Sequence, residues 1–179
     1  MASDGARHGV PLTFAIAALS LGLAHAVVGH EPKVLYFPTP QAAVDKMLDM
    51  AEIKSGDVLI DLGSGDGRIP ITAAKAYGIQ AHGVDIDPKL IETSTDNAKR
   101  EGVADKVTFK QQDLFKTDLG DATIITMFLL TSINDQLRPR LQQLKPGTRV
   151  LSYSFGMSDW KPDRVERVDG RAIYLWIVR

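Results

Sequence analysis

Hydrophobic positions after about residue 40 form short runs that predict β-strands, separated by stretches with the spacing of amphipathic helices. The predicted strands are residues 57–62, 80–84, 107–111, 122–130 and 149–155. The run 122–130 is continuously apolar and rich in branched side chains, as expected for a central strand that is buried on both faces. Strands that alternate with helices favour a parallel sheet with helices on both faces.

The predicted helices are bounded by capping residues. Thr39-Pro40 is typical of an N-cap followed by proline at the first helical position, and Asp87-Pro88 repeats this pattern. Residues 70–77 predict a helix that Gly67-Arg68 opens. A further helical stretch follows the fourth strand, and we expect Pro139 to restart that helix because proline is unfavourable inside one.

The C-terminal part has a different pattern. Residues 165–168 and 172–178 are two strand-like runs on either side of Asp169-Gly170, which is a strong signal for a β-hairpin. The hairpin adds an antiparallel strand at or near one edge of the sheet. The predicted fold class is therefore α/β, with a doubly wound, mostly parallel seven-stranded sheet (Rossmann-like) and a C-terminal antiparallel hairpin.

The first 30 residues form an apolar leader that precedes a folded domain over residues 31–179. Residues 10–28 carry no charged side chain and come close to the roughly 20 residues that a membrane-spanning helix needs. Ala24-His25-Ala26 is similar to a signal-peptidase site, so the leader is either a membrane anchor or a signal peptide cleaved near Ala26. These two interpretations remain open.

Composition excludes several classes of function. The chain of 179 residues has a formal net charge of -1, which gives no sign of a nucleic-acid partner. It has no cysteine, so disulfides and cysteine nucleophiles are excluded. The four histidines form no ligand pair at helical spacing, and we therefore expect no metal site.

Candidate chemistry gathers at the ends of three predicted strands. Asp61 precedes a loop with the spacing Gly63-x-Gly65-x-Gly67, in which glycine permits positive φ values and close approach of a ligand to the backbone. Asp85 follows the second strand, and Asp113 follows the third. Carboxylates in these places can accept hydrogen bonds from ribose hydroxyls and from an adenine amino group, which predicts a nucleoside pocket at this edge of the sheet.

The loop differs from those that bind dinucleotides or phosphates. A dinucleotide loop requires glycine or alanine where this chain has Arg68, and a P-loop requires Gly-Lys-Ser/Thr. The carboxylate of Asp61 would repel a pyrophosphate but suits the ammonium of a methionine moiety. An NAD-dependent oxidoreductase is therefore disfavoured.

Over roughly residues 36–179, these motifs resemble the seven-stranded class I methyltransferases, which implies S-adenosyl-L-methionine as the cofactor. By position, Asp61, Gly63 and Gly65 would hold the methionine part, Asp85 the ribose, and Asp113 the adenine amino group. Ile86 and Leu114 would enclose the adenine ring. The complete set of expected cofactor-binding residues is Asp61, Gly63, Ser64, Gly65, Asp66, Gly67, Asp85, Ile86, Asp113 and Leu114. Asp87 is expected to be a helix N-cap instead of a ligand.

A narrower resemblance concerns the acceptor. A group of lysine methyltransferases has similar motifs at Tyr36-Phe37-Pro38-Thr39-Pro40, Gly65-Asp66-Gly67-Arg68 and Asp113-Leu114-Phe115-Lys116. Its members modify the adenine nucleotide translocator and the ATP synthase c subunit, and the chain resembles their bacterial relatives. The chain departs from the bacterial members at Phe128-Leu129-Leu130-Thr131 and Ser152-Tyr153-Ser154-Phe155. The expected substrate channel consists of Tyr36, Thr39, Phe128, Tyr153 and Trp160. Phe128 and Trp160 are also readily explained as core aromatics.

The resulting expectation is an S-adenosylmethionine-dependent methyltransferase that modifies a protein lysine, with a membrane protein as one candidate partner and the domain on the cytoplasmic face of a membrane. The alternatives are a small-molecule methyltransferase, a non-catalytic binding protein of the same fold, or export after cleavage of the leader. Base methylation is disfavoured because the Asn/Asp-Pro-Pro-aromatic motif is missing after the fourth strand.

Overall fold

The computed structural model describes residues 36–179. The helices are α1 (Gln41–Met50), α2 (Arg68–Tyr77), α3 (Pro88–Arg100), the short 3-10 helix η1 (Leu114–Lys116) and α4 (Thr131–Leu141). The strands are β1 (Val58–Leu62), β2 (Gln80–Asp85), β3 (Val107–Gln111), β4 (Ile124–Met127), β5 (Arg149–Tyr153), β6 (Arg164–Val168) and β7 (Arg171–Ile177). The apolar leader 1–30, including the proposed spanning run 10–28 and the cleavage site near Ala26, lies outside the described residues.

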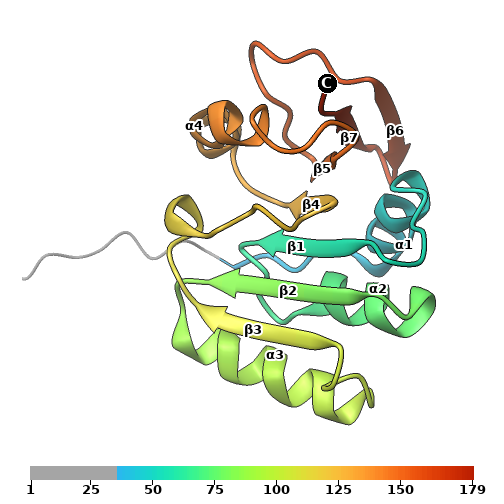
Figure 1. Ribbon diagram of the computed structural model, residues 1–179, viewed down its shortest axis with the longest axis vertical. Coiled ribbons are helices and arrows are strands. Elements are labelled where there is room, and N and C mark those ends of the chain that lie inside the picture. Colours follow the sequence, from blue (N-terminus) through green and yellow to red (C-terminus); the bar gives the residue numbers. More distant parts are fainter. Residues whose placement is uncertain (1–35) are drawn as a thin grey trace, which may run out of the picture. The chain divides into compact units, whose positions relative to one another are not determined.

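The seven strands form one sheet in the order β3-β2-β1-β4-β5-β7-β6. Strands β1 to β5 run parallel to one another, and β7 pairs antiparallel with both β5 and β6. The predicted fold class is therefore confirmed, including the antiparallel strand near one edge. In Figure 1 the arrowheads of β1, β2 and β3 end on the same side of the molecule, so the residues that follow them share one edge of the sheet.

The hairpin between β6 and β7 forms as its sequence predicts. Asp169 and Gly170 both have positive φ, at 50° and 78°, which is the backbone of a type I′ turn. This turn has the twist of the strands beside it, and it places Val168 opposite Arg171. Asp-Gly is suited to it because both residue types tolerate the left-handed region.

The two predicted helix caps have different outcomes. The side chain of Asp87 accepts a hydrogen bond from the Lys89 amide at 2.9 Å, so the predicted N-cap of α3 is confirmed. The predicted cap at Thr39 is wrong, because α1 starts one residue later with Pro40 at the N-cap position and without a side-chain cap. Thr39 is buried, and its carbonyl oxygen accepts a hydrogen bond from Arg68 instead.

Two further predictions are corrected around β4 and α4. The strand covers residues 124–127 of the apolar run 122–130, since Leu130 is exposed and is the N-cap residue of α4. An apolar run alone does not distinguish a buried strand from the loop that leaves it. Pro139 lies inside α4 and does not restart it. Leu137 and Leu141 on either side of it are fully buried, and this packing holds the helix together despite one lost backbone hydrogen bond.

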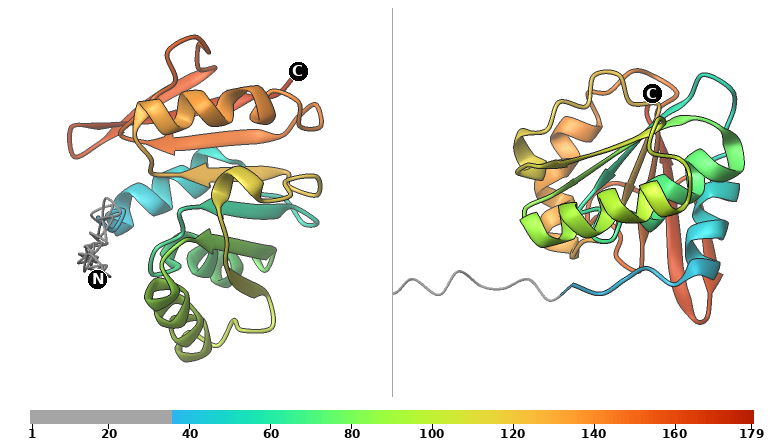
Figure 2. Two further views of the ribbon diagram at one scale, coloured as in Figure 1. Left: turned by 90° about the vertical axis from the view of Figure 1, so that its left-hand side faces the viewer. Right: turned by 90° about the horizontal axis from the view of Figure 1, so that it is seen from below.

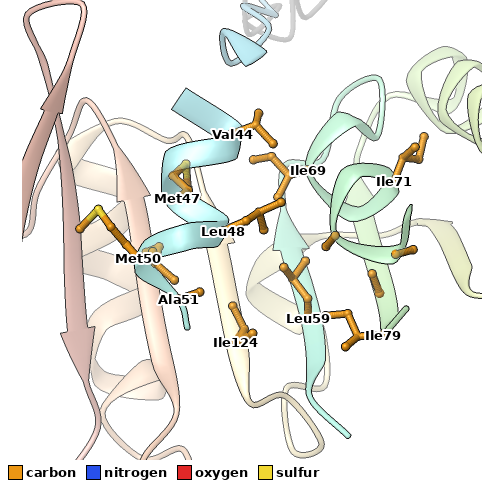
Figure 3. Packing of buried hydrophobic residues seen from close by; sticks show 14 of the residues in the cluster. Val44, Met47, Leu48, Met50, Ala51, Leu59, Ile69, Ile71, Ile79 and Ile124 are labelled. Atoms are coloured by element: carbon orange, nitrogen blue, oxygen red, sulfur yellow. The ribbon is translucent and has the colours of Figure 1, made fainter. Parts of the chain in front are cut away.

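The sheet separates two hydrophobic cores. The first core contains apolar side chains of α1, α2 and α3 packed against one face. Figure 3 shows part of it, where side chains of α1 face those of α2 and of strands β1 and β4. The second core lies on the other face and contains Leu137 and Leu141 of α4 with Met127, Val150 and Trp176. Figure 2 shows α1 and α4 on opposite sides of the sheet, as this division requires.

Within residues 36–179, no helix has the length and apolar character that crossing a membrane would require.

An ion pair joins the starts of three strands to the end of α1. Asp57 accepts hydrogen bonds from Arg149 at 2.5 Å, from Thr123 at 2.8 Å and from the Lys54 amide at 2.7 Å. Arg149 also donates to the carbonyl of Ala51 at 2.8 Å. Burial by itself raises the pKa of Asp57, but the hydrogen bonds it accepts outweigh burial, so its pKa is lower than usual. The charged carboxylate therefore stabilises the folded state.

We predict that Asp57→Ala lowers the free energy of unfolding by about 3 kcal/mol, because it leaves the largely buried Arg149 without its partner. Urea denaturation at pH 7 measures this. The matched control is Lys75→Ala, which removes an exposed ion pair with Glu101 and should have a much smaller effect, because solvent screens exposed pairs. Since folding depresses the pKa of Asp57, the cost should shrink as the pH falls through the folded-state pKa, below the unfolded value of 3.8. Equal losses in the two variants would contradict the assignment.

Candidate active site

The loop after β1 is fixed to the end of β2 by backbone hydrogen bonds. The amides of Gly63 and Ser64 both donate to the carbonyl of Val84 at 2.9 Å. The amide of Gly67 donates to the carbonyl of Ser64 at 2.9 Å, which closes the turn into α2. The φ values of Gly63, Gly65 and Gly67 are 78°, 54° and 81°, so the expected positive-φ loop is confirmed.

Glycine is required in this loop partly because aromatic side chains of the protein lie where a Cβ atom would be. A Cβ at Gly67 would lie 2.5 Å from the ring of Phe109 in β3, so Gly67 serves the packing of the loop. A Cβ at Gly65 would lie 2.3 Å from the ring of Tyr36. Sequence reasoning expected the glycines to make room for a ligand, and the structure shows that Tyr36 and Phe109 also need this room.

Asp85 lies at the end of β2 directly beside the loop. One carboxylate oxygen accepts a hydrogen bond from the Gly65 amide at 2.9 Å, and the other accepts one from the Asp87 amide at 3.0 Å. The next side chain, Ile86, is 66% exposed although it is apolar. A carboxylate with an exposed apolar side chain beside it can bind a group that carries both hydroxyls and a flat ring.

Asp61 is buried below the loop. It faces Thr126 of the neighbouring strand β4, whose hydroxyl donates to it at 2.7 Å. Burial and, to a smaller extent, the nearby charges of Asp85 and Asp66 raise the pKa of Asp61 to about 7, although the hydrogen bond from Thr126 lowers it. Sequence reasoning missed Thr126. Thr126 could have been found as a hydroxyl side chain inside the apolar run 122–130, because a buried hydroxyl needs a hydrogen-bond partner.

The Asp66 side chain points to Arg68, with which it forms an ion pair at 2.5 Å. Burial raises the pKa of Asp66, but the contacts with Arg68 outweigh burial and lower it. The hydroxyl of Tyr36 accepts a weak hydrogen bond from the Asp66 amide at 3.4 Å. Burial, followed by the charge of Asp66, raises the pKa of Tyr36, so the phenol is neutral.

Asp113 and Leu114 lie just beyond β3. The Asp113 carboxylate accepts a hydrogen bond from the Phe115 amide at 2.9 Å and so caps η1. The same carboxylate lies 3.7 Å from Lys116 and is partly exposed. Leu114 packs against the second core. Asp113 thus has a local structural role and still presents a carboxylate at the edge that Asp85 also occupies.

An aromatic cluster lies at the carboxyl ends of β4 and β5. The ring of Phe128 meets Tyr153 edge-on, with centroids 4.9 Å apart, and stacks on Phe155 at 6.1 Å. Leu129, next to Phe128, lies over Gly63 of the loop. The structure therefore brings two of the expected channel residues together, and it adds Phe155, which was expected only as part of a strand.

The structure does not bring Trp160 to this cluster. Its ring lies 5.8 Å from Trp176, and its carbonyl accepts a hydrogen bond from the Trp176 indole at 2.7 Å. Trp176 belongs to the second core and pairs with Val150, near the start of β5, whereas Tyr153 belongs to the first core at its end. Trp160 is therefore a core aromatic on the opposite face of the sheet.

Asn134 of α4 is a second residue that sequence reasoning missed. It is fully buried, and its amide nitrogen donates to Leu129, Phe155 and Gly156 carbonyls and to the Ser152 hydroxyl, at 3.0–3.3 Å. Ser152 lies in β5, and the other partners lie in the loops that follow β4 and β5. The sequence gives no signal for such a role, because an asparagine in a predicted helix can be either exposed or buried and only the fold distinguishes the two.

The side chains at the carboxyl ends of β1, β2 and β3 favour a ligand that carries hydrogen-bond donors and no negative charge. Asp61, Asp85 and Asp113 are hydrogen-bond acceptors when ionised, so they suit hydroxyl, amino and ammonium groups and repel phosphate. Within residues 36–179 no cluster of histidine and acidic side chains could hold a metal ion. A nucleoside with a cationic substituent fits this edge of the sheet, which also has an exposed apolar side chain for its base.

Comparisons with known proteins agree with this geometry. The family model of the ANTKMT methyltransferase domain matches residues 61–164. A protein-lysine N-methyltransferase of Saccharolobus islandicus is 39% identical over 157 residues, covering 84% of this chain and 98% of that protein. The adenine nucleotide translocase lysine N-methyltransferase of Mus musculus is 32% identical and matches 73% of this chain, which spans 57% of that relative's length.

Among solved structures, this chain is similar to the crystal structure of an RNA methyltransferase from Salinibacter ruber in complex with S-adenosyl-L-homocysteine. The TM-score is 0.77 and the identity 49%, over 79% of this chain and 94% of that one.

The unusual pKa of Asp61 predicts a pH dependence of stability. The unfolded carboxyl ionises near 3.8, whereas the folded one keeps its proton to about pH 7. The stability that protonation provides is therefore present below pH 4 and is lost as the pH rises to 7. Relative to Asp61→Asn, which does not titrate, the wild-type free energy of unfolding should fall by roughly 2–4 kcal/mol across this interval. Urea denaturation of both proteins at pH 4.5 and 8 tests this, and a constant difference would refute it.

Proposed function

Because the chain belongs to the family of the ANTKMT methyltransferase domain and is an S-adenosylmethionine-dependent methyltransferase, we propose that it methylates the side-chain amine of a protein lysine. The observation that carries this proposal is the match with the Saccharolobus protein-lysine N-methyltransferase, which extends over nearly the whole of that protein. The Mus musculus relative is likewise a lysine methyltransferase by name, although this chain covers less of its length.

In this proposal the cofactor lies along the carboxyl ends of β1, β2 and β3. Asp85 binds the ribose hydroxyls, and Asp61 lies below the methionine end, where an ammonium group would favour its ionised form. The backbone of Gly63 and Gly65 lines the same end. Ile86 and Leu114 enclose the adenine, and Asp113 accepts a hydrogen bond from its amino group. In this arrangement each carboxylate accepts from a donor group of the cofactor, and each apolar side chain contacts the adenine ring.

Three loop residues support the cofactor site in other ways. The Ser64 hydroxyl is buried and lies against Gly83 of β2, so this residue contributes its backbone amide to the loop. The Asp66 carboxylate is engaged by Arg68 and therefore orders the loop. Gly67 allows Phe109 to pack beneath the turn.

The reaction places demands on the acceptor side of the site. The bound cofactor supplies a methyl group on a sulfonium, and the lysine nitrogen forms a bond to this carbon as the carbon–sulfur bond breaks. The lysine must first lose a proton to solvent, because an ammonium has no lone pair. The aromatic cluster of Phe128, Tyr153 and Phe155 favours the neutral amine by keeping water away from it. Alignment and desolvation are the tasks assigned to the protein.

RNA is a second candidate acceptor, because the Salinibacter relative of known structure is described as an RNA methyltransferase. Two features of this chain weigh against it. The net charge is -1, and the side chains at the carboxyl edge of the sheet include Asp85, Asp87 and Asp113, which would repel a phosphate backbone. Residues 128–131 also lack the Asn/Asp-Pro-Pro-aromatic sequence expected for methylation of a base amino group.

We predict that the purified protein transfers label from radioactive S-adenosylmethionine to a protein band when it is incubated with a cell extract divided into soluble protein, membranes, RNA and small molecules. Acid hydrolysis of the band should yield methyllysine. Prior acetylation of lysines in the extract should abolish the labelling and serves as the control. Label confined to RNA or to small products would overturn the proposal in favour of the corresponding acceptor.

We also predict that Asp85→Ala weakens the binding of S-adenosylhomocysteine at least tenfold, or about 1.4 kcal/mol, because the ribose loses a charged acceptor. Isothermal titration calorimetry measures the affinity. Asp87→Ala is the matched control, since this neighbouring carboxylate caps α3 and should affect stability by about 1 kcal/mol without changing affinity. Unchanged affinity in Asp85→Ala would rule out the ribose assignment.

A further inference from the structure

A strap of five residues, Tyr36 to Pro40, lies across the glycine loop before the chain enters α1. The ring of Tyr36 covers Gly65 so closely that a Cβ there would lie 2.3 Å from it, and its hydroxyl accepts a hydrogen bond from the Asp66 amide at 3.4 Å. In Figure 1 this blue segment leads to α1 from beside the carboxyl end of β1. A residue that precedes the first helix thus forms part of the loop's outer surface.

Arg68 binds the strap and the loop at the same time. One terminal nitrogen of its guanidinium donates to the carbonyl of Thr39 at 2.8 Å. The Nε and the other terminal nitrogen donate to the two carboxylate oxygens of Asp66 at 2.9 and 2.5 Å. The guanidinium is planar and holds these donors in a fixed arrangement, which a lysine ammonium does not reproduce.

We call the hydrogen bonds of Arg68 to Thr39 and Asp66 the clamp. Other hydrogen bonds hold the glycine loop, to which the clamp attaches the strap. The carbonyl of Asp66 accepts a hydrogen bond from Asn97 of α3 at 2.8 Å, so the loop is held from its other side as well. The amide of the preceding Gly65 is held by Asp85 at 2.9 Å. The loop is therefore a fixed base, and the position of the strap relative to it depends on Arg68. The hydrogen bond from the Asp66 amide to the Tyr36 hydroxyl is too long to hold the strap alone.

We propose that Arg68 is a positioning residue of the cofactor site, which fixes the strap so that the ring of Tyr36 forms one wall over Gly65. This inference rests on the proposed location of the cofactor along the glycine loop and does not depend on the acceptor. Arg68 acts through Thr39 and Tyr36 and does not itself touch the cofactor. A bound methionine moiety at Gly65 loses this wall when the clamp is removed.

A double-mutant cycle tests the proposal with S-adenosylhomocysteine as the titrated ligand. Tyr36→Ala and Arg68→Lys should each weaken binding by about fivefold or more, and the double variant should be weaker than the poorer single variant by less than about twofold. Such coupling means that the two residues act on one feature. An unchanged affinity in Arg68→Lys, or losses that multiply in the double variant, would overturn the proposal.

Control variants separate positioning from a loss of folding. Tyr36→Phe keeps the ring and should bind nearly as tightly as the wild type. Lys75→Gln, which removes an exposed ion pair on α2, should have no effect on affinity. Thermal unfolding of every variant shows whether the fold is retained.

Limited digestion with chymotrypsin provides an independent measurement, because the bond after Tyr36 is in the strap. Arg68→Lys should accelerate this cleavage, and S-adenosylhomocysteine should slow it in the wild type but much less in the variant. Equal cleavage rates in the two proteins would contradict the clamp. If the coupling is found but no lysine is methylated, the acceptor proposal fails and this inference stands. If no variant or wild-type protein binds S-adenosylhomocysteine, the location of the cofactor fails and this inference fails with it.

Discussion

The carbonyl oxygen of Val84 accepts hydrogen bonds from the amides of both Gly63 and Ser64, and the arrangement of the site depends on this double contact. It ties the loop after β1 to the end of β2, the neighbouring parallel strand. The next amide, that of Gly65, consequently meets the carboxylate of Asp85. The loop ends at Gly67, the N-cap residue of α2, and this helix packs its apolar side chains into the first core. A parallel sheet makes this possible because its strands end together at one edge.

The acidic residues near this edge of the sheet have different pKa values and hydrogen-bond partners, because their surroundings differ. Asp61 is buried opposite Thr126, and its pKa is raised to about 7. Asp66 meets a guanidinium, and its pKa is lowered. Asp85 accepts hydrogen bonds from two backbone amides, and Asp113 caps a short helix. Below pH 7 the Asp61 carboxyl is mostly neutral, which reduces the negative charge under the loop in the ligand-free protein, and a cationic ligand would favour the ionised form.

A single helix residue binds the two loops that the proposed function assigns to the acceptor side of the site. The loops after β4 and β5 carry Phe128 and Phe155, and Asn134 of α4 binds the backbone of both loops. Strand β4 ends at Met127, and the apolar residues after it lie outside the sheet, where Phe128 joins the aromatic cluster and Leu129 covers Gly63. The ring of Tyr36 in the strap before α1 covers Gly65, so two segments far apart in sequence cover neighbouring glycines of one loop.

The sequence alone determined the order of elements, the parallel sheet with its terminal hairpin, and the positions of Asp61, Asp85 and Asp113 at successive strand ends. These features follow from local periodicity, turn residues and the polarity of parallel strands, which act over a few residues. The glycine loop and its likeness to class I methyltransferases could also be identified from sequence, since Arg68 and Asp61 disfavour a dinucleotide loop and the three carboxylates follow successive strands.

The tertiary structure decided what depends on contacts between distant residues. Thr39 is not the N-cap of α1, because the first backbone hydrogen bonds of the helix are accepted by the Pro40 carbonyl, while the Thr39 carbonyl binds Arg68. Pro139 stays inside α4, where the leucines on either side of it are buried. Trp160 and Phe128 are both aromatic residues near strand ends, yet they lie on opposite faces of the sheet, since one packs with Trp176 and the other with Tyr153. Thr126 and Asn134 acquire their roles only from partners that the fold brings to them. A residue's type sets which bonds it can make, but the fold decides which partner is within reach.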